Sequence, residues 1–274
     1  MTLATNNGNN QNMKHDVVWQ QASLTQTYLE GVRGAIPLAA EQIDIMLRLI
    51  QAADHPVHTV LDLGCGDGIL GQAVLDQHSE AMGVFADFSP PMLAAAHQRL
   101  AGYNNAHFVL SDYGQTGWQE GILTPLDEHG FDVIVSGFSI HHQPDGRKRE
   151  LYEELYDLLN PSGLFLNLEH VSSPTRWLEH QFEQHFIDAL VDYHTTTGSG
   201  KTREQIDRDY YNRPDKAANI LAPVELQCTW LREVGFQDVD CYLKIFELAL
   251  FGGRKPVHSP FVVTIYQSST TSSR

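Results

Sequence analysis

Short apolar runs alternate with helix-like stretches along the middle of the chain. The runs are HTVLDL, AMGVFADF, HFVLSD, FDVIVSGF and GLFLNLEH, which begin at residues 58, 81, 107, 131 and 163. Helices are expected from about Ile69, from Pro91, and through Lys148 to Leu159. The runs lack period-two alternation, as strands buried on both faces of a parallel sheet should. This pattern predicts right-handed crossovers and a doubly wound α/β sheet.

A sheet of this kind also indicates where a ligand binds. Ligands of doubly wound sheets lie beyond the carboxyl ends of the strands. The loops that follow Leu63, Ala86, Leu110 and Ser136 are therefore predicted to surround one site. Ser136, at the end of the fourth run, is itself a candidate ligand contact.

The segments on either side of this alternation have other patterns. Apolar residues recur at helical spacing from about Met13 to Ala52, with a break between Gly31 and Pro37. Residues 173–222 are polar, aromatic and His-rich with helical spacing, and we expect a helical lid over the strand ends. After the helix VELQCTWLREVGF, the stretches DVDCYLKIFELALFGG and FVVTIYQ are expected to form a hairpin of final strands.

The chain is expected to form one domain. Its 274 residues can bury one α/β core plus an insertion, and a composition of 42% hydrophobic and 19% charged residues is typical of globular proteins. The domain is predicted to span residues 13–268, with the lid at 173–222. The polar ends, residues 1–12 and 269–274, are expected to be disordered tails.

Charge and cysteine content narrow the function classes. A net charge of -16 opposes broad attraction to nucleic-acid phosphates, so a small-molecule substrate is favoured. The basic triplet at residues 147–149 is expected to cap or solvate a helix face. The three cysteines are distant from one another, which favours a reduced protein in the cytoplasm. The Asn-rich start has no apolar run, so neither a signal peptide nor a membrane anchor is expected.

A glycine-rich loop follows the first predicted strand in VLDLGCGDGILG. Gly64, Gly66 and Gly68 can turn sharply and bring backbone amides close to a ligand at the start of the next helix. The stretch from Gly66 to Gly71 also reads as G-x-G-x-x-G, the dinucleotide fingerprint. A dehydrogenase that binds a nicotinamide or flavin cofactor is therefore one alternative.

Two acidic residues distinguish between these ligands. Asp62 ends the first strand, where it would repel a pyrophosphate but attract the ammonium and sulfonium groups of S-adenosylmethionine (SAM). Asp87 ends the second strand, where a carboxylate can bind both hydroxyls of an adenosine ribose. The charge pattern favours SAM over a dinucleotide.

At these residues the chain resembles the class I, Rossmann-like SAM-dependent methyltransferases, from about Thr59 to Val171. VLDLGCGDG resembles the family's first motif, ADFSPPML the second, HFVLSDY the third, FDVIVSGFSIHH the fourth, and LLNPSGLFLNLEH the segment after it. The resemblance implies a seven-stranded sheet whose last strand is antiparallel. It also implies SAM as the cofactor and a set of cofactor contacts: Arg33, Asp62, Gly64, Gly66, Gly68, Asp87, Phe88, Ser89, Met92, Asp112, Tyr113 and Ser136.

Particular contacts follow from the same resemblance. Ser89 and Met92 are expected to pack the adenosine, Asp112 to meet the adenine amino group, and Tyr113 to lie beside the ring. Upstream, YLEGVRGAIP resembles a segment whose arginine contacts the cofactor carboxylate, which implies that role for Arg33.

Methyl transfer needs alignment of the acceptor and sometimes removal of its proton. His141 and His142 follow the fourth strand, and histidine titrates near neutrality, so both are candidate bases. Tyr211 in the lid is a third catalytic candidate, and Asp209 or Glu247 could assist. Predicted substrate contacts are Glu169, His170, Tyr210 and Arg213, whose aromatic faces and fixed cation suit an acceptor with a ring or a carboxylate.

A metal site is not expected. His180 and His185, in the His-rich run from His170 to His194, are five residues apart, which is poorer helical ligand spacing than the i, i+4 pairs of zinc helices. A helical lid of this type often mediates dimers, so a homodimer is a further hypothesis.

Four other functions remain open. The lid and the stretch WLREVGFQDVDCYLKIFELALFGGRK resemble the carboxy-SAM synthases, which use SAM and prephenate and hold a carboxylate with a lid arginine. Arg213 or Arg203 could take that part. A tRNA methyltransferase is possible on the same scaffold, although the charge opposes it. The others are a non-catalytic SAM-binding protein and the dehydrogenase.

Overall fold

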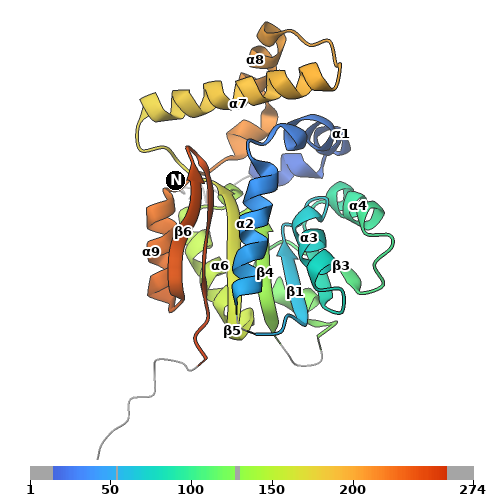
Figure 1. Ribbon diagram of the computed structural model, residues 1–274, viewed down its shortest axis with the longest axis vertical. Coiled ribbons are helices and arrows are strands. Elements are labelled where there is room, and N and C mark those ends of the chain that lie inside the picture. Colours follow the sequence, from blue (N-terminus) through green and yellow to red (C-terminus); the bar gives the residue numbers. More distant parts are fainter. Residues whose placement is uncertain (1–14, 54, 127–129, 258–274) are drawn as a thin grey trace, which may run out of the picture.

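A seven-stranded sheet forms the centre of the computed structural model, which describes residues 15–53, 55–126 and 130–257 (Figure 1). The strand order is β3-β2-β1-β4-β5-β7-β6, and β7 runs antiparallel to both of its neighbours. The strands are β1 Thr59–Leu63, β2 Met82–Asp87, β3 Ala106–Leu110, β4 Phe131–Gly137, β5 Leu159–His170, β6 Gln237–Ile245 and β7 Leu248–Arg254. The predicted fold class is confirmed.

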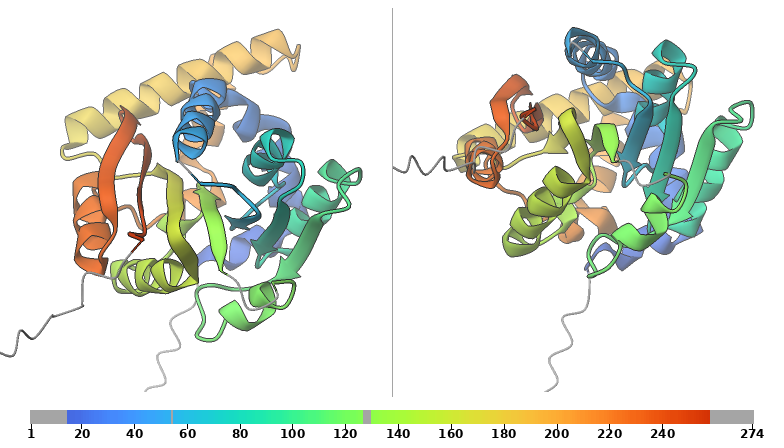
Figure 2. Two further views of the ribbon diagram at one scale, coloured as in Figure 1. Left: turned by 60° about the horizontal axis from the view of Figure 1, so that its bottom comes forward. Right: turned by 90° about the horizontal axis from the view of Figure 1, so that it is seen from below.

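Helices cover both faces of this sheet (Figure 2). One hydrophobic cluster joins one face to α2, α3 and α4, and a second joins the other face to α5, α6 and α9. Their bounds are α2 Ala39–Ala52, α3 Ile69–Gln77, α4 Pro90–Arg99, α5 Gln119–Leu123, α6 Asp145–Leu158 and α9 Val224–Val234. The structure is therefore a three-layer α/β/α sandwich.

The residues of β4 show why these strands lack alternation. Val133, Ile134 and Val135 have no exposed surface. Val133 and Val135 belong to the α2–α3–α4 cluster, whereas Ile134 belongs to the α5–α6–α9 cluster. Because successive side chains point to opposite faces and both faces are buried, these three consecutive positions are all apolar.

Two further groups of helices lie at the carboxyl ends of the strands. The first contains η1 His15–Gln20, α1 Ala22–Thr27, η2 Tyr28–Val32 and η3 Arg33–Ala35, and we call it the N-terminal cap. The second is the predicted lid, with α7 Arg176–Thr196, α8 Arg203–Tyr211 and η5 Pro214–Ala218. Both stand over the same end of the sheet (Figure 1).

The lid packs on the domain through aromatic side chains. Phe182 and Phe186 of α7 are buried in a third cluster with Tyr210, Ile36 and Leu248. Leu248 begins β7, so the lid contacts the sheet directly. The helical spacing in RWLEHQFEQHFIDALVDYH therefore reflects burial against the strand ends.

Two local expectations need correction. Within the described residues, β6 and β7 form a hairpin joined at residues 246–247, so DVDCYLKIFELALFGG supplies two strands rather than one, extended by Gln237 and Arg254. FVVTIYQ and both predicted tails lie outside the described residues. The basic triplet is not wholly solvated, because Lys148 is fully buried and its Nζ donates to Asp145 and to the Ile220 carbonyl.

Over the described ranges, no helix is both long enough and apolar enough to span a bilayer.

Candidate functional site

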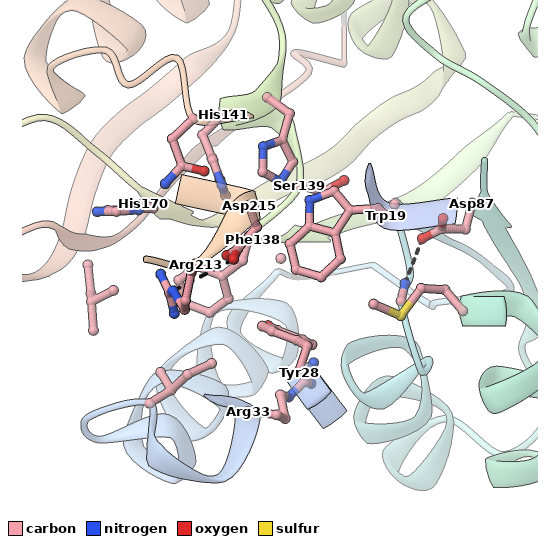
Figure 3. A pocket seen from close by; sticks show the side chains of 18 of the residues that line it. Trp19, Tyr28, Arg33, Asp87, Phe138, Ser139, His141, His170, Arg213 and Asp215 are labelled. Atoms are coloured by element: carbon pink, nitrogen blue, oxygen red, sulfur yellow. Dashed lines mark hydrogen bonds and ion pairs between the residues drawn. The ribbon is translucent and has the colours of Figure 1, made fainter. Parts of the chain in front are cut away.

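A cleft lies where the cap, the lid and the strand ends meet, with about 970 Å³ of space that is partly open to solvent. Figure 3 shows its walls, with residues of the cap, the β4 loop and the lid turned toward one centre. The lining residues are Trp19, Tyr28, Arg33, Ile36, Gly64, Cys65, Gly66, Asp87, Phe88, Met92, Gly137, Phe138, Ser139, His141, His142, His170, Phe182, Phe186, Tyr210, Arg213, Asp215, Asn219 and Leu248. Residues predicted for the cofactor and for the acceptor thus share one cavity.

The glycine loop forms one wall of this cleft. Gly64, Gly66 and Gly68 have φ of 61°, 55° and 79°, in the left-handed region that glycine enters at little cost. Gly68 caps the start of α3, and a side chain on Gly66 would meet only Met92, at 3.9 Å. The loop therefore leaves backbone open to the cavity at Gly66, as a close ligand approach requires.

Asp87 occupies the end of β2 beside that loop. Its Oδ2 accepts from the Gly66 amide at 2.9 Å, and its Oδ1 accepts from the Ser89 amide at 2.8 Å (Figure 3). Burial raises the pKa of Asp87 to about 6, even though these amides favour the charged form. Phe88 and Met92 line the cleft next to it, whereas Ser89 is buried below and caps α4.

Asp62 and Arg33 line a second cavity that shares Gly64, Phe138 and other walls with the cleft. Asp62 Oδ2 accepts from the Gly71 amide at 2.8 Å, while Oδ1 has no hydrogen-bond partner among the described residues. Burial raises the pKa of Asp62 to about 8. Arg33 lines both cavities and pairs with Asp67 at 3.3 Å. An unpaired buried carboxyl beside a partly exposed guanidinium matches an amino acid group, which carries one charge of each sign.

The other predicted cofactor residues lie behind the cleft wall. Ser136 donates to the Leu63 carbonyl at 2.8 Å and so ties β4 to β1. Asp112 accepts from the Gly114 amide at 2.9 Å and shapes the loop after β3. The Tyr113 hydroxyl lies 2.6 Å from Ser139 Oγ, so this ring supports the β4 loop. None of the three is in the wall of the cleft.

At the acceptor end, His141 is held by Glu169. His141 Nδ1 lies 2.5 Å from Glu169 Oε1, and Glu169 has no exposed surface. The amides of His141 and His170 also donate to the two Glu169 oxygens, at 3.0 and 2.9 Å. Because both oxygens act as acceptors, we assign the proton to Nδ1. The side chain of Asn219 makes a further hydrogen bond to this ring. Burial lowers the pKa of His141 well below its usual value and raises that of Glu169 to about 7.

Glu169 was predicted to contact the substrate, but it lies behind His141 and outside the cleft wall. Its position suits a residue that orients the ring of His141.

His142 and His170 also have a hydrogen-bond partner for one ring nitrogen. The rings of His141 and His142 have centroids 4.0 Å apart, and His142 Nδ1 faces the Ala218 carbonyl at 3.3 Å. His170 Nε2 lies 2.9 Å from Glu247 Oε2, whose other oxygen accepts from the Ser173 amide at 3.2 Å. All three histidines line the cleft. Ala218 belongs to η5 of the lid, and Glu247 accepts from the Ser173 amide just before α7.

Of the predicted lid residues, Tyr210 and Arg213 line the cleft and Tyr211 does not. Tyr210 is buried, lines the cleft and lies under the Arg213 guanidinium, 5.1 Å from its ring centroid. Tyr211 is 41% exposed, points outside the cleft and donates to Glu183 at 3.0 Å. The structure therefore does not bring Tyr211 to the other catalytic candidates.

Several residues in the wall were not predicted, namely Trp19, Tyr28, Phe138, Asp215 and Asn219. Trp19 and Tyr28 belong to the cap, about 40 residues before the glycine loop, where no motif distinguishes them. Phe138 and Asn219 line the cleft with the histidine pair, and only their proximity to predicted elements could have indicated them. Across the described ranges, no group of three or more His, Cys, Asp or Glu residues is arranged to hold a metal ion.

Comparison with known proteins agrees with this geometry. Residues 61–165, from β1 into β5, match a sequence family described as a methyltransferase domain. This part of the chain is therefore similar to methyltransferase domains, and the fold is the one seen in solved Rossmann-like methyltransferases. The predicted resemblance to methyltransferases is confirmed over these residues.

Individual relatives are distant. A carboxy-S-adenosyl-L-methionine synthase of Helicobacter hepaticus is 23% identical over 74% of this chain and 78% of its own length. The solved N-methyltransferase NodS of Bradyrhizobium japonicum, in complex with S-adenosylhomocysteine, has a TM-score of 0.51, 15% identity, and coverage of 84% and 98%. An O-methyltransferase family protein of Burkholderia thailandensis has a TM-score of 0.51 at 16% identity, over 79% of this chain and 58% of that one. This chain thus spans little more than half of the last protein, and these structures establish the fold alone.

Proposed function

We propose that this methyltransferase transfers the methyl group of SAM to a small-molecule acceptor, which binds between the lid and the histidine pair His141–His142. The observation that carries the proposal is the continuity of the cleft. Gly64, Gly66 and Asp87 line one part of it, and the histidine pair lines another part with lid residues. An acceptor bound there would lie next to the cofactor without crossing the protein.

The residues at the cofactor end suit each part of SAM. Asp62 and Arg33 would hold the ammonium and carboxylate groups, since Asp62 Oδ1 is buried without a hydrogen-bond partner among the described residues. Asp87 would exchange its amide contacts for the ribose hydroxyls. Bound SAM supplies a methyl group made electrophilic by a sulfonium, so the protein chiefly needs to align the acceptor and accept its proton.

The histidine pair would provide the proton acceptor. Burial lowers the pKa of both His141 and His142 well below the usual value, so both rings are neutral near pH 7. Glu169 would act as a positioning residue that fixes the tautomer of His141 and compensates a positive charge on either ring. The lid would exclude water from this end of the cleft.

Calorimetric titration with SAM, S-adenosylhomocysteine and NAD tests the proposal. We expect both adenosyl compounds to bind and NAD not to bind. Asp87→Ala should weaken binding tenfold or more, about what the loss of charge-assisted hydrogen bonds costs. Asp44→Ala, on the exposed side of α2, is the control and should bind as the wild type does. Binding of NAD alone would instead support the dehydrogenase alternative.

A second candidate is a carboxy-SAM synthase activity, which rests on Arg213 and on the Helicobacter relative. Arg213 lines the cleft, and its Nε has no hydrogen-bond partner within the described part of the chain, although Asp215 lies 3.7 Å away. A partly exposed guanidinium of this kind suits a carboxylate. Incubation with SAM and prephenate, followed by mass analysis, distinguishes a carboxylated nucleoside from S-adenosylhomocysteine.

The remaining expectations concern location and partners. We infer that the enzyme is cytoplasmic. We also infer that it acts on a small molecule rather than on RNA, since its net charge of -16 opposes binding to phosphate backbones. Failure to retain tRNA at low salt would support this inference. The homodimer is a further proposal, and light scattering of the purified protein at several concentrations tests it.

A further inference from the structure

Trp19 lines the cleft, and its indole carries a buried hydrogen-bond donor. Trp19 is 9% exposed, and its Nε1 has no hydrogen-bond partner in residues 15–53, 55–126 and 130–257. The ring contacts Tyr28 at a centroid distance of 5.2 Å (Figure 3). It also contacts His142, at a centroid distance of 5.8 Å. Its own carbonyl accepts from Ser89 Oγ at 2.7 Å, which anchors the cap to the start of α4.

A buried N–H group without a partner costs free energy comparable to a lost hydrogen bond. The indole nitrogen can only donate, so a ligand that satisfies it must offer an acceptor atom. Because Trp19 lines the cleft, a bound molecule can supply that atom.

His142, beside Trp19, presents the opposite property. The Ala218 carbonyl that faces His142 Nδ1 can only accept, so Nδ1 carries the proton of the neutral ring. Nε2 is then a lone-pair acceptor. The two rings are tilted by 49° at a centroid distance of 5.8 Å, and both residues line the cleft.

We propose that Trp19 and His142 together form a hydroxyl-binding site and that the methyl acceptor is therefore an alcohol or a phenol. A hydroxyl group accepts from Trp19 Nε1 and donates to His142 Nε2 at the same time. An ammonium group cannot accept from the indole, and a carboxylate cannot donate to the imidazole. A neutral amine has one lone pair, so an amine that accepts from the indole has none left to attack the methyl group, whereas a hydroxyl oxygen has two. The inference rests on the proposed function, since it assigns the accepting atom of that reaction.

The assignment gives a balanced transfer. The hydroxyl oxygen forms one bond to the methyl carbon, the S–C bond breaks with its electron pair left on sulfur, and the proton passes to His142 Nε2. The imidazolium then returns the proton to solvent. Glu169 favours this step because its charge raises the pKa of His142, against the effect of burial.

A binding experiment tests the site without turnover. The cleft wall includes the aromatic rings of Tyr28, Phe182 and Tyr210, so we use 4-fluorophenol as the probe and follow its 19F NMR signal with protein saturated in S-adenosylhomocysteine. 4-Fluoroanisole keeps the ring and the oxygen but lacks the proton. 4-Fluorobenzylamine, charged at neutral pH, cannot accept. We expect the phenol to bind at least fivefold more tightly than either analogue.

Two variants assign the preference to the two rings. Trp19→Phe keeps an aromatic ring and removes the N–H, and His142→Phe removes the acceptor. Each should reduce the preference for the phenol over the anisole to less than twofold. Trp177→Phe is the matched control, because Trp177 is 68% exposed on α7, and it should retain the full preference.

The outcomes separate this inference from the proposed function. Equal signals from the phenol and the anisole, including no signal from both, would overturn the hydroxyl site. An unchanged preference for the phenol over the anisole in Trp19→Phe would also overturn the hydroxyl site. If Trp19→Phe instead lost affinity for S-adenosylhomocysteine, the indole would belong to the cofactor site and the inference would fail while the methyltransferase proposal stood. Absence of cofactor binding by the wild type would overturn the proposed function itself.

Discussion

The side chain of Ser139 lies directly against Gly64, the first glycine of the loop after β1. A β-carbon on Gly64 would be 1.9 Å from Ser139 Oγ and 2.6 Å from Ser139 Cβ. Ser139 Oγ also lies 2.6 Å from the Tyr113 hydroxyl. Ser139 therefore joins three segments, which are the glycine loop, the loop before the histidine pair and the loop after β3.

We expect Gly64→Ala to destabilise the fold as well as the cofactor site. Its φ of 61° costs a residue with a β-carbon about 1–2 kcal/mol, and overpacking against Ser139 adds about 1–3 kcal/mol. Urea denaturation measures the change in the free energy of unfolding. Adding Ser139→Gly should recover the overpacking part, so equal instability of the single and double variants would contradict the contact. Gly102→Ala, where a β-carbon meets nothing within 4 Å, is the control.

The charge state of Asp62 predicts proton release when the cofactor binds. Burial raises the pKa of Asp62 to about 8, with Asp67 and Asp87 acting in the same direction and Arg33 opposing them. The carboxyl is thus largely protonated at pH 7 in the free protein. An ammonium group beside it favours the carboxylate and lowers the pKa, so binding releases a proton and affinity rises as pH increases toward 8.

Calorimetry of S-adenosylhomocysteine binding at pH 7, in buffers with different ionisation enthalpies, measures this proton release. We expect between about half a proton and one proton per site for the wild type, and close to none for Asp62→Asn. Proton uptake by the wild type, or affinity that falls between pH 6 and 8, would show that Asp62 does not face the ammonium group.

Much of the fold could be predicted because local patterns determined it. Val133 to Val135 are apolar at every position because both sheet faces are covered, and this signal survives without knowledge of the partners. The final hairpin was misplaced for the opposite reason. The turn at Phe246 and Glu247 contains neither glycine nor proline, and Phe246 has a φ of 52°, so no turn signal divides DVDCYLKIFELALFGG.

The site could be predicted only in part, and the limits are physical. Gly66 lies in a glycine-rich loop after β1 and Asp87 ends β2, and each is identified by the residues next to it in the sequence. Glu169 and His141 are 28 residues apart and meet only because β4 and β5 are neighbours, so the role of Glu169 depends on sheet order. Trp19 reaches the cleft through packing of the cap, which sequence spacing does not encode.

The pair of Glu169 and His141 gives a prediction that does not need the acceptor. Proton-detected 15N spectra of the histidine side chains should show the Nδ1–H tautomer for His141, because the carboxylate accepts from that nitrogen at 2.5 Å. Glu169→Gln removes the charge that stabilises an imidazolium, so the pKa of His141 should fall further. In turnover, once an acceptor is found, we expect a plateau rate about 10–100-fold lower, with the acid limb shifted to lower pH.

Glu153→Gln is the control for that variant, since Glu153 is exposed on α6 and far from the cleft wall. It should leave both the histidine spectra and the pH profile as in the wild type. An Nε2–H tautomer of His141 in the wild type would contradict the assignment of Glu169 as its positioning residue.

Glu247 should control how firmly the lid is attached. It is buried at the β6–β7 turn, where one oxygen contacts His170 Nε2 at 2.9 Å and the other accepts from the Ser173 amide at 3.2 Å. Its carbonyl also accepts from the Val171 amide at 2.8 Å. Glu247→Ala removes the two side-chain contacts and retains the third.

We therefore expect amide hydrogen exchange in the peptide over residues 171–175 of Glu247→Ala to accelerate about tenfold, as a loss of roughly 1.4 kcal/mol of local stability would give. Exchange in β1 should not change, and Glu179→Ala, on the exposed side of α7, should leave both peptides as they are in the wild type. Unchanged exchange at residues 171–175 in Glu247→Ala would mean that the aromatic cluster around Phe182 holds the lid without help from this carboxylate.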